Sequence, residues 1–191
     1  MKTTTFTIFF ISLLFISCQK KGNCMNYDLK KIGAIISLPN SYRLVDSNQL
    51  DLIVNKKDDE AFKGELKDFY IKNPNKQLLI DTLNPYNFIL LSVITPYVPI
   101  DTNTLYFVIE RERSLSSSSP NVSDSAFYVG SKMDSISNFK FIVSKYKRTK
   151  FNKKRIGYNY MISTDRKTIG IAFYSPEEQE TRPFINSIKL R

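Results

Sequence analysis

The amino-acid sequence predicts an α+β fold, in which a mostly antiparallel sheet carries helices packed on its faces. Runs rich in β-branched and aromatic residues recur along the chain and are typical of strands. Short polar turns join three of these runs near the C-terminus, which favours antiparallel neighbours. Two other segments carry apolar residues at helical spacing, and helices beside such a sheet define the α+β class.

The first half of the chain is expected to contain two short strands, a helix and a hairpin. Residues 30–45 read as a strand, a turn at Pro39-Asn40 and a second strand. Residues 58–74 read as a helix, because Phe62, Leu66 and Phe69 form one apolar stripe. Residues 87–98 and 104–113 are rich in β-branched and aromatic residues, so we expect them to pair as a hairpin.

The second half is expected to form a surface loop, a short helix, a three-stranded meander and a final helix. The loop covers residues 114–125 and the short helix covers residues 126–133. The strands of the meander cover residues 138–151, 155–165 and 167–175. Alternation predicts that Tyr158, Tyr160 and Ile162 share one face of the second strand, and that Ile169, Ile171 and Phe173 share one face of the third. Ser175 suits the N-cap of the last helix, although Pro183 allows a kink or a fresh helix start there.

The N-terminus has the features of an export signal. Lys2 precedes an apolar run from Phe6 to Ile16, which is too short to span a bilayer. The end of this run, Ser17-Cys18, resembles the lipobox of bacterial lipoproteins. The resemblance implies cleavage before Cys18 and a lipid on its sulfur. We therefore expect a signal peptide over residues 1–17, a lipidated cysteine with a flexible tether over 18–29, and one domain over 30–191.

Two other interpretations of the N-terminus stay open. An uncleaved apolar anchor is one of them. A disulfide between Cys18 and Cys24, the two cysteines of the chain, is the other. Such a disulfide would close a very small loop and would contribute little stability. Under the lipoprotein interpretation, the Cys24 thiol is inert or pairs between molecules.

The sharpest candidate site is a basic cluster between Lys145 and Arg155, interleaved with Tyr146 and Phe151. Its seven members are Lys145, Lys147, Arg148, Lys150, Lys153, Lys154 and Arg155. In an exported, membrane-anchored protein, these cations favour anionic lipids, acidic glycans or another envelope protein over nucleic acid. The competing interpretation is a solvated hairpin whose lysines protect the edge of a sheet.

Composition argues against several classes of enzyme. The chain has no histidine, which excludes histidine-dependent triads and histidine-ligated metals. The two S-x-x-K strings, at Ser137 and Ser144, lie in strand-like sequence and lack the companion motifs of penicillin-recognising enzymes. No glycine-rich phosphate loop or calcium loop occurs. We expect no cofactor and no catalytic activity.

Three segments resemble the PsbP-like and DcrB-like α/β/α sandwich group. They are "ISLPNSYRLV" at residues 36–45, "YNYMISTDRKTIGIAFYS" at 158–175 and "FINSIKL" at 184–190. The resemblance spans about residues 30–190 and implies a sandwich fold. It also implies an accessory or ligand-binding module, since members of this group are typically not enzymes.

The leading hypothesis is therefore a lipid-anchored, non-catalytic binding or accessory module of the cell envelope, facing the periplasm or the cell surface. Its basic hairpin would contact an anionic surface or polymer. An alternative is a protective, immunity-like lipoprotein that binds one protein partner. A hydrolase that works without histidine is the third hypothesis, because paired carboxylates can also catalyse hydrolysis.

Overall fold

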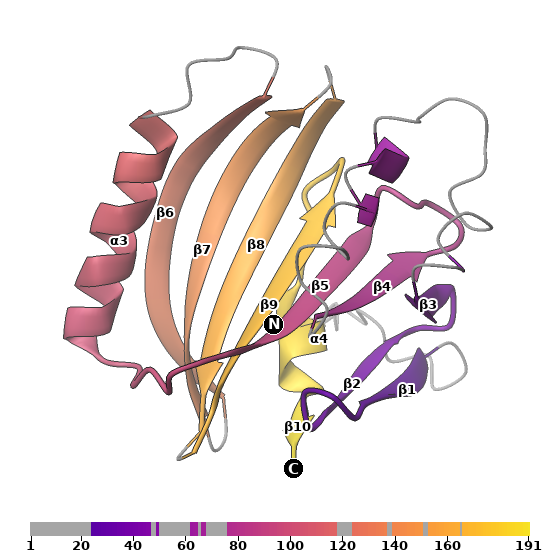
Figure 1. The fold of residues 1–191 in the computed structure, drawn as a ribbon, viewed down its shortest axis with the longest axis horizontal. Coiled ribbons are helices and arrows are strands. Elements are labelled where there is room, and N and C mark those ends of the chain that lie inside the picture. The colour runs from indigo at the N-terminus through magenta and orange to yellow at the C-terminus, as the bar shows by residue number, and fades with distance from the viewer. Residues whose placement is uncertain are drawn as a thin grey trace, which may run out of the picture.

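The structure, a computed structural model, places most of the chain in two antiparallel sheets. It describes residues 24–46, 49, 62–64, 66–67, 76–117, 124–136, 139–150, 153–164 and 166–191. The two sheets lie against each other and share one hydrophobic core, with helices beside them (Figure 1). This arrangement confirms the predicted α+β class.

The larger sheet has seven strands in the order β3-β4-β5-β9-β8-β7-β6, and every neighbouring pair is antiparallel. The strands are β3 (Tyr42–Val45), β4 (Gln77–Asp81), β5 (Phe88–Ile94), β6 (Asp124–Ile136), β7 (Phe139–Lys150), β8 (Lys153–Ser163) and β9 (Thr168–Ser175). Strands β7, β8 and β9 form the meander that the sequence predicts. Its last turn closes through the Thr164 amide, which donates to the Lys167 carbonyl at 2.9 Å.

The smaller sheet has the order β1-β2-β10 and consists of β1 (Cys24–Leu29), β2 (Ala34–Pro39) and β10 (Lys189–Leu190). The turn from β1 to β2 uses Gly33 at a φ of 67°, in the left-handed region that glycine adopts without strain. Helix α4 (Arg182–Asn186) lies beside β2, and the chain then enters β10.

One face of the seven-stranded sheet, here called the core face, packs on the smaller sheet and α4. Leu79, Ile89, Phe141, Ile171 and Phe173 come from the large sheet and are buried on this face. The opposing layer contributes Leu29, Ile36, Leu38, Ile185 and Ile188. The predicted alternation of β8 and β9 is therefore confirmed, because the residues of one face are all buried: Tyr160, Ile162, Ile169, Ile171 and Phe173.

The opposite face, here called the groove face, is covered only in part. Residues 62–64 and 66–67 are helical, and the buried Phe62 and Leu66 pack with Leu78, Ile80 and Phe88. This confirms two positions of the predicted stripe, while Phe69 lies outside the described residues. At the other edge, helix α3 (Thr102–Ser117) packs against β6 (Figure 1).

Two element predictions are wrong. Residues 104–113 belong to α3 instead of a strand, so β5 pairs with β4 and β9. The helix start is fixed by Asp101, whose Oδ1 accepts the Thr104 amide at 2.8 Å, a capping contact that outweighs the β propensity of the segment. Residues 126–133 form part of β6 instead of a helix, because pairing with β7 along twelve registers overrides local preference.

The C-terminal helix begins later than Ser175. Ser175 ends β9, and its Oγ donates to Asn87 Oδ1 at 2.9 Å while accepting the Glu177 amide at 3.2 Å. The helix starts at Arg182, with Pro183 in its first turn. Of the two alternatives predicted at Pro183, the fresh helix start is therefore the correct one. Lys189 lies in strand β10, which follows the helix.

The folded domain also begins earlier than predicted. Residues 24–29 were expected to belong to a flexible tether, but they form β1 and pair with β2 from Cys24 opposite Pro39 to Leu29 opposite Ala34. Cys24 is an exposed thiol at the start of this strand. The predicted signal peptide and Cys18 lie outside the described residues. The predicted loop at 114–125 is also shorter, since α3 reaches Ser117 and β6 begins at Asp124.

Candidate functional site

The seven predicted basic residues lie on one hairpin, β7–β8, but strand geometry divides them between two faces. The register pairs Arg148 with Arg155 and Thr149 with Lys154. Because successive side chains of a strand point to opposite faces, Lys145, Lys147 and Lys154 lie on the side of the core face. Arg148 and Arg155 lie on the groove face. Lys150 and Lys153 pair at the hairpin end, and their side chains lie outside the described part.

Alternation also separates Ser144 from Lys147. They are three positions apart on β7 and therefore point to opposite faces of the sheet. The S-x-x-K string at Ser144 thus brings no lysine to its serine. Ser137 of the other string lies outside the described residues.

Arg155 belongs to the packing of the domain. Its side chain is only 3% exposed, and its guanidinium lies 4.7 Å from the Phe62 ring centroid and 5.8 Å from that of Phe88. A cation over aromatic faces stabilises such a buried arrangement. Arg155 therefore joins the helical segment at Phe62 to the sheet and is not part of a surface patch.

Lys145 is held by an acidic partner. Its Nζ forms an ion pair with Glu178, whose Oε1 also accepts the Tyr158 hydroxyl at 3.1 Å. The hydrogen bond between them raises the pKa of Lys145 and lowers the pKa of Glu178. These residues line a cavity of about 590 Å³ on the side of the core face. A second ion pair, Arg182 with Asp134, lies at the same cavity and lowers the pKa of Asp134.

Lys147 and Lys154 are the members of the predicted cluster whose described side chains are exposed. They stand on the same side of adjacent strands, two register positions apart. Their ammonium groups can therefore meet a large anionic surface without rearrangement of the fold. Of the predicted basic cluster, this pair is the part that is exposed on that side of the hairpin.

A second cavity, about 510 Å³ in volume, lies on the groove face. It is called the groove below. Strands β5, β9, β8 and β7 form its floor, and α3 forms one wall through Val108, Arg111 and Glu112. Leu66 and Lys76 line it on the other side. No sequence pattern predicts this site, because its lining comes from elements far apart in the chain.

The groove is hollow because β9 carries small residues on this face. Gly170 and Ala172 alternate with the large core residues Ile169, Ile171 and Phe173. A Cβ at Gly170 would approach Ser92 Oγ to 2.9 Å and Ile94 Cδ1 to 3.3 Å, so the floor is closely packed at this point. Apolar side chains, including Leu90, Ile142 and Met161, cover the rest of the floor.

One end of the groove is polar. Ser144 is 3% exposed, and its Oγ lies 2.6 Å from Ser131 Oγ, which accepts the Tyr128 hydroxyl at 2.7 Å. Burial raises the pKa of the Tyr146 phenol, and the nearby Glu112 carboxylate raises it further. Asn159 Oδ1 is buried here and accepts no hydrogen bond from the described residues.

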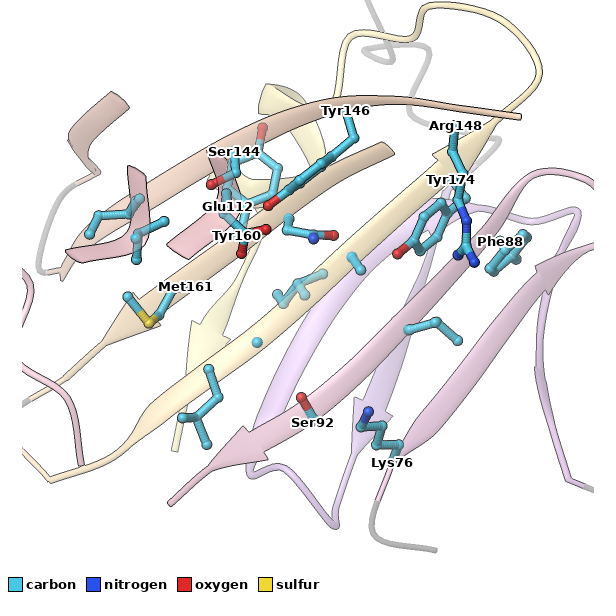
Figure 2. A pocket seen from close by; sticks show the side chains of 18 of the residues that line it. Lys76, Phe88, Ser92, Glu112, Ser144, Tyr146, Arg148, Tyr160, Met161 and Tyr174 are labelled. Carbon is cyan, nitrogen blue, oxygen red and sulfur yellow. The ribbon is translucent and has the colours of Figure 1, made fainter. Parts of the chain in front are cut away.

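The charges of the groove are mostly positive. Figure 2 shows Arg148 reaching from β7 toward Tyr174 and Phe88, while Lys76 lies across the floor near Ser92. Glu112 lies beside Tyr146 and Ser144 at the polar end (Figure 2). With Arg111, the lining carries three cations and one anion. Lys76 is half-buried, and this burial lowers the pKa of its ammonium.

Within the described ranges, no group of three or more Asp, Glu and Cys side chains could hold a metal ion. None of the helices in the same ranges has the length and apolar character needed to cross a membrane.

Comparison with known proteins identifies the fold. The solution structure of cyanobacterial PsbP (CyanoP) from Synechocystis sp. PCC 6803 superposes with a TM-score of 0.53 at 11% identity, covering 92% of this chain and 98% of that one. The chain has a PsbP-like fold. This likeness confirms the fold that the sequence resemblance implied.

A crystal structure from Bacteroides thetaiotaomicron is also similar, with a TM-score of 0.49 and 10% identity. The match covers 87% of this chain and 48% of that one. No family model matches the sequence, and no curated protein matches it either. At such low identities, the PsbP-like domain carries information about fold alone.

Proposed function

We propose that this chain is a non-catalytic binding module, tethered by a lipid on Cys18 to a membrane of the cell envelope. Its basic hairpin contacts an anionic polymer of the envelope, such as an acidic glycan or lipopolysaccharide. The observation that carries the proposal is the exposed pair Lys147 and Lys154, which stands on one side of the β7–β8 hairpin. The leader and the absence of histidine support the location and the lack of catalysis.

The position of the tether supports a partner away from the anchoring membrane. If Cys18 carries the lipid, only residues 19–23 separate it from β1. A flexible coil of that length reaches about 12 Å. The end of the β7–β8 hairpin lies at the top of Figure 1, whereas β1 and β2 lie at the lower right. The hairpin end and β1, the first described strand after Cys18, therefore lie at different ends of the domain.

Mass spectrometry of the protein purified from membranes tests the anchor. We expect a chain that begins at Cys18 and carries diacylglycerol, often with an additional acyl group on the new amine. A chain that still begins at Met1, or one with an unmodified Cys18 thiol, would remove the tether from the proposal.

Charge reversal tests the hairpin. The double variant Lys147→Glu/Lys154→Glu should elute from a heparin or immobilised lipopolysaccharide column at clearly lower salt than the wild type, because both phosphate and sulfate contacts are screened by salt. The matched control is Lys30→Glu/Lys31→Glu, which makes the same change of charge at exposed positions between β1 and β2. Equal losses in both variants would show that net charge, not the hairpin, governs retention.

A second candidate function, binding of one protein partner, is favoured by large exposed apolar side chains on α3 and β6. Tyr106, Phe107 and Phe127 are 67%, 64% and 66% exposed. Exposed apolar groups of this size mark interaction surfaces when they gather on one region. A pull-down from envelope extract with wild type and Tyr106→Glu/Phe107→Glu separates the two candidates, because both changes lie on α3, whereas Phe127 is the register partner of Lys147. A single stoichiometric partner lost in the variant would favour this function over polymer binding.

A further inference from the structure

The groove is independent of the surface that the proposed function uses. Lys147 and Lys154 lie on the side of the core face, whereas the groove occupies the opposite side of the same strands. The groove has a volume of about 510 Å³, within the range of roughly 300–1,000 Å³ that is typical of small-molecule sites. Binding of a polymer by the hairpin therefore does not account for the residues that line the groove.

The floor of the groove favours an apolar ligand that contacts side chains only. Strand β9 is hydrogen-bonded to β5 on one side and to β8 on the other. Its backbone therefore cannot add a further strand, which excludes a peptide bound by sheet extension. Leu90, Ile142 and Met161 give this floor an apolar surface, which offers no hydrogen-bonding side chains to the hydroxyl groups of a sugar at these positions. A flexible hydrocarbon chain matches both properties.

The cations of the groove favour an anionic group at one end of that chain. Arg148 is only partly buried and lines the cavity beside Tyr174, in contrast to the fully packed Arg155. A guanidinium is well suited to bind a carboxylate or phosphate through two parallel hydrogen bonds. Lys76 and Arg111 add positive charge to the lining, and Glu112 lies at the other, polar end beside Tyr146 (Figure 2).

We propose that the groove binds a single-chain amphiphile with an anionic head group, such as a fatty acid or a lysophospholipid. The head binds to Arg148, and the chain lies over Ala172 along the floor. The two head groups share this chemistry, and competition experiments distinguish them.

Photolabelling of the full-length protein in its own membranes tests this inference. The probe is a palmitic acid analogue with a diazirine in its chain, used below saturation, and the labelled peptides are identified by mass spectrometry. We expect labelling in β5, β8 and β9 that excess palmitate abolishes and that palmityl alcohol, which lacks the charge, leaves in place. Stronger competition by lysophosphatidic acid than by palmitate would assign the head group as phosphate.

Two variants probe the two ends of the ligand. Arg148→Gln should reduce labelling about tenfold or more, because it removes charge-assisted hydrogen bonds to the head group. Lys30→Gln, at an exposed position between β1 and β2, is the matched loss of one positive charge and should label like wild type. Ala172→Phe fills the floor and should also abolish labelling, and its thermal melt shows whether the domain remains folded.

Three results would overturn the inference. They are labelling that never saturates, equal competition by palmitate and palmityl alcohol, and unchanged labelling in Arg148→Gln. None of them bears on the hairpin, since retention on an anionic column depends on Lys147 and Lys154. Conversely, loss of column retention in the lysine variants leaves the groove experiment intact.

Discussion

The two faces of the seven-stranded sheet differ in how completely they are covered. The core face meets a second sheet and α4, and together they bury one continuous cluster of large apolar side chains. The groove face is covered by Phe62 and Leu66 at one side and by α3 at the other, with a cavity between them. The same strands thus provide a stabilising core on one side and a candidate binding site on the other.

Strand β9 shows how the sequence produces this difference. Its odd positions Ile169, Ile171 and Phe173 face the core, while Gly170 and Ala172 between them face the groove. The large residues bury apolar area on the core face, and the small residues leave space for the groove on the opposite face. Stability should therefore be sensitive to truncation on the core face and tolerant of enlargement at Ala172 on the groove face, whereas a Cβ at Gly170 would meet Ser92 Oγ at 2.9 Å.

The largest expected loss of stability comes from a change on the core face, at Phe173. Its ring packs on Phe184 at a centroid distance of 5.9 Å and meets Tyr160 edge-on at 5.7 Å. Phe173→Ala should lower the free energy of unfolding by about 3–5 kcal/mol, since truncating a buried Phe leaves a cavity.

Ala172→Leu, one residue away on the groove face, is the matched comparison. It should change the free energy of unfolding by less than about 1 kcal/mol, because the groove can accept the added atoms. Urea denaturation followed by circular dichroism measures both variants. A loss in Ala172→Leu as large as that in Phe173→Ala would mean that the groove face is packed like the core.

The core face was largely predictable from the sequence, because its signal is local. Alternation along β8 and β9 grouped Tyr160 with Ile162, and Ile171 with its neighbours on the same face, before any pairing was known, and these residues are buried. The turn at Pro39-Asn40 and the buried pair Phe62 and Leu66 were also correctly predicted. Each of these features depends only on residues a few positions apart.

The groove was not predictable, since its walls come from elements distant in sequence. Lys76 precedes β4, Glu112 belongs to α3 and Arg148 to β7, and only the folded chain brings them to one cavity. The α3 segment itself was read as a strand because Tyr106, Phe107 and Val108 resemble one. The capping Asp101 was the local signal that would have corrected this reading.

An intermediate loss of stability is expected for a change at Lys167, which joins the ends of the two sheets. Lys167 Nζ donates to the backbone carbonyls of Ile32 and Gly33, both at 3.0 Å, and to that of Arg191 at 3.1 Å. Lys167→Met keeps the aliphatic stem but leaves these carbonyls without their donor. The free energy of unfolding should fall by about 1–3 kcal/mol.

Gly33→Ala tests the same junction from the other side. It places a Cβ about 2.6 Å from Lys167 Nζ at a φ of 67°, so it should also destabilise the domain. If Lys167→Met and Gly33→Ala both unfold like wild type in urea, the junction contributes nothing to the attachment of the smaller sheet.

The smallest expected effect is a pH-dependent change in melting temperature at the ion pair between Asp134 and Arg182, beside the cavity on the core-face side. A hydrogen bond from Arg182 holds the pKa of Asp134 below its ordinary value of 3.8. A carboxyl with a depressed pKa in the folded state stabilises the fold above that ordinary value, and this contribution disappears as the pH falls through the folded-state pKa. Asp134→Asn should therefore lower the melting temperature at pH 7 by about 1–3 °C.

At pH 2.5 the same substitution should have a smaller effect than at pH 7, because a pH below 3.8 protonates Asp134 in the unfolded state and moves the folded-state carboxyl toward protonation. Glu110→Gln is the control, since it removes an ion pair with Arg113 on the exposed surface of α3, where such pairs contribute little. Differential scanning calorimetry of the three proteins at both pH values measures the effect. A melting difference between wild type and Asp134→Asn that is equal at pH 7 and pH 2.5 would show that the carboxylate charge does not stabilise this edge, and that Arg182 is held by packing alone.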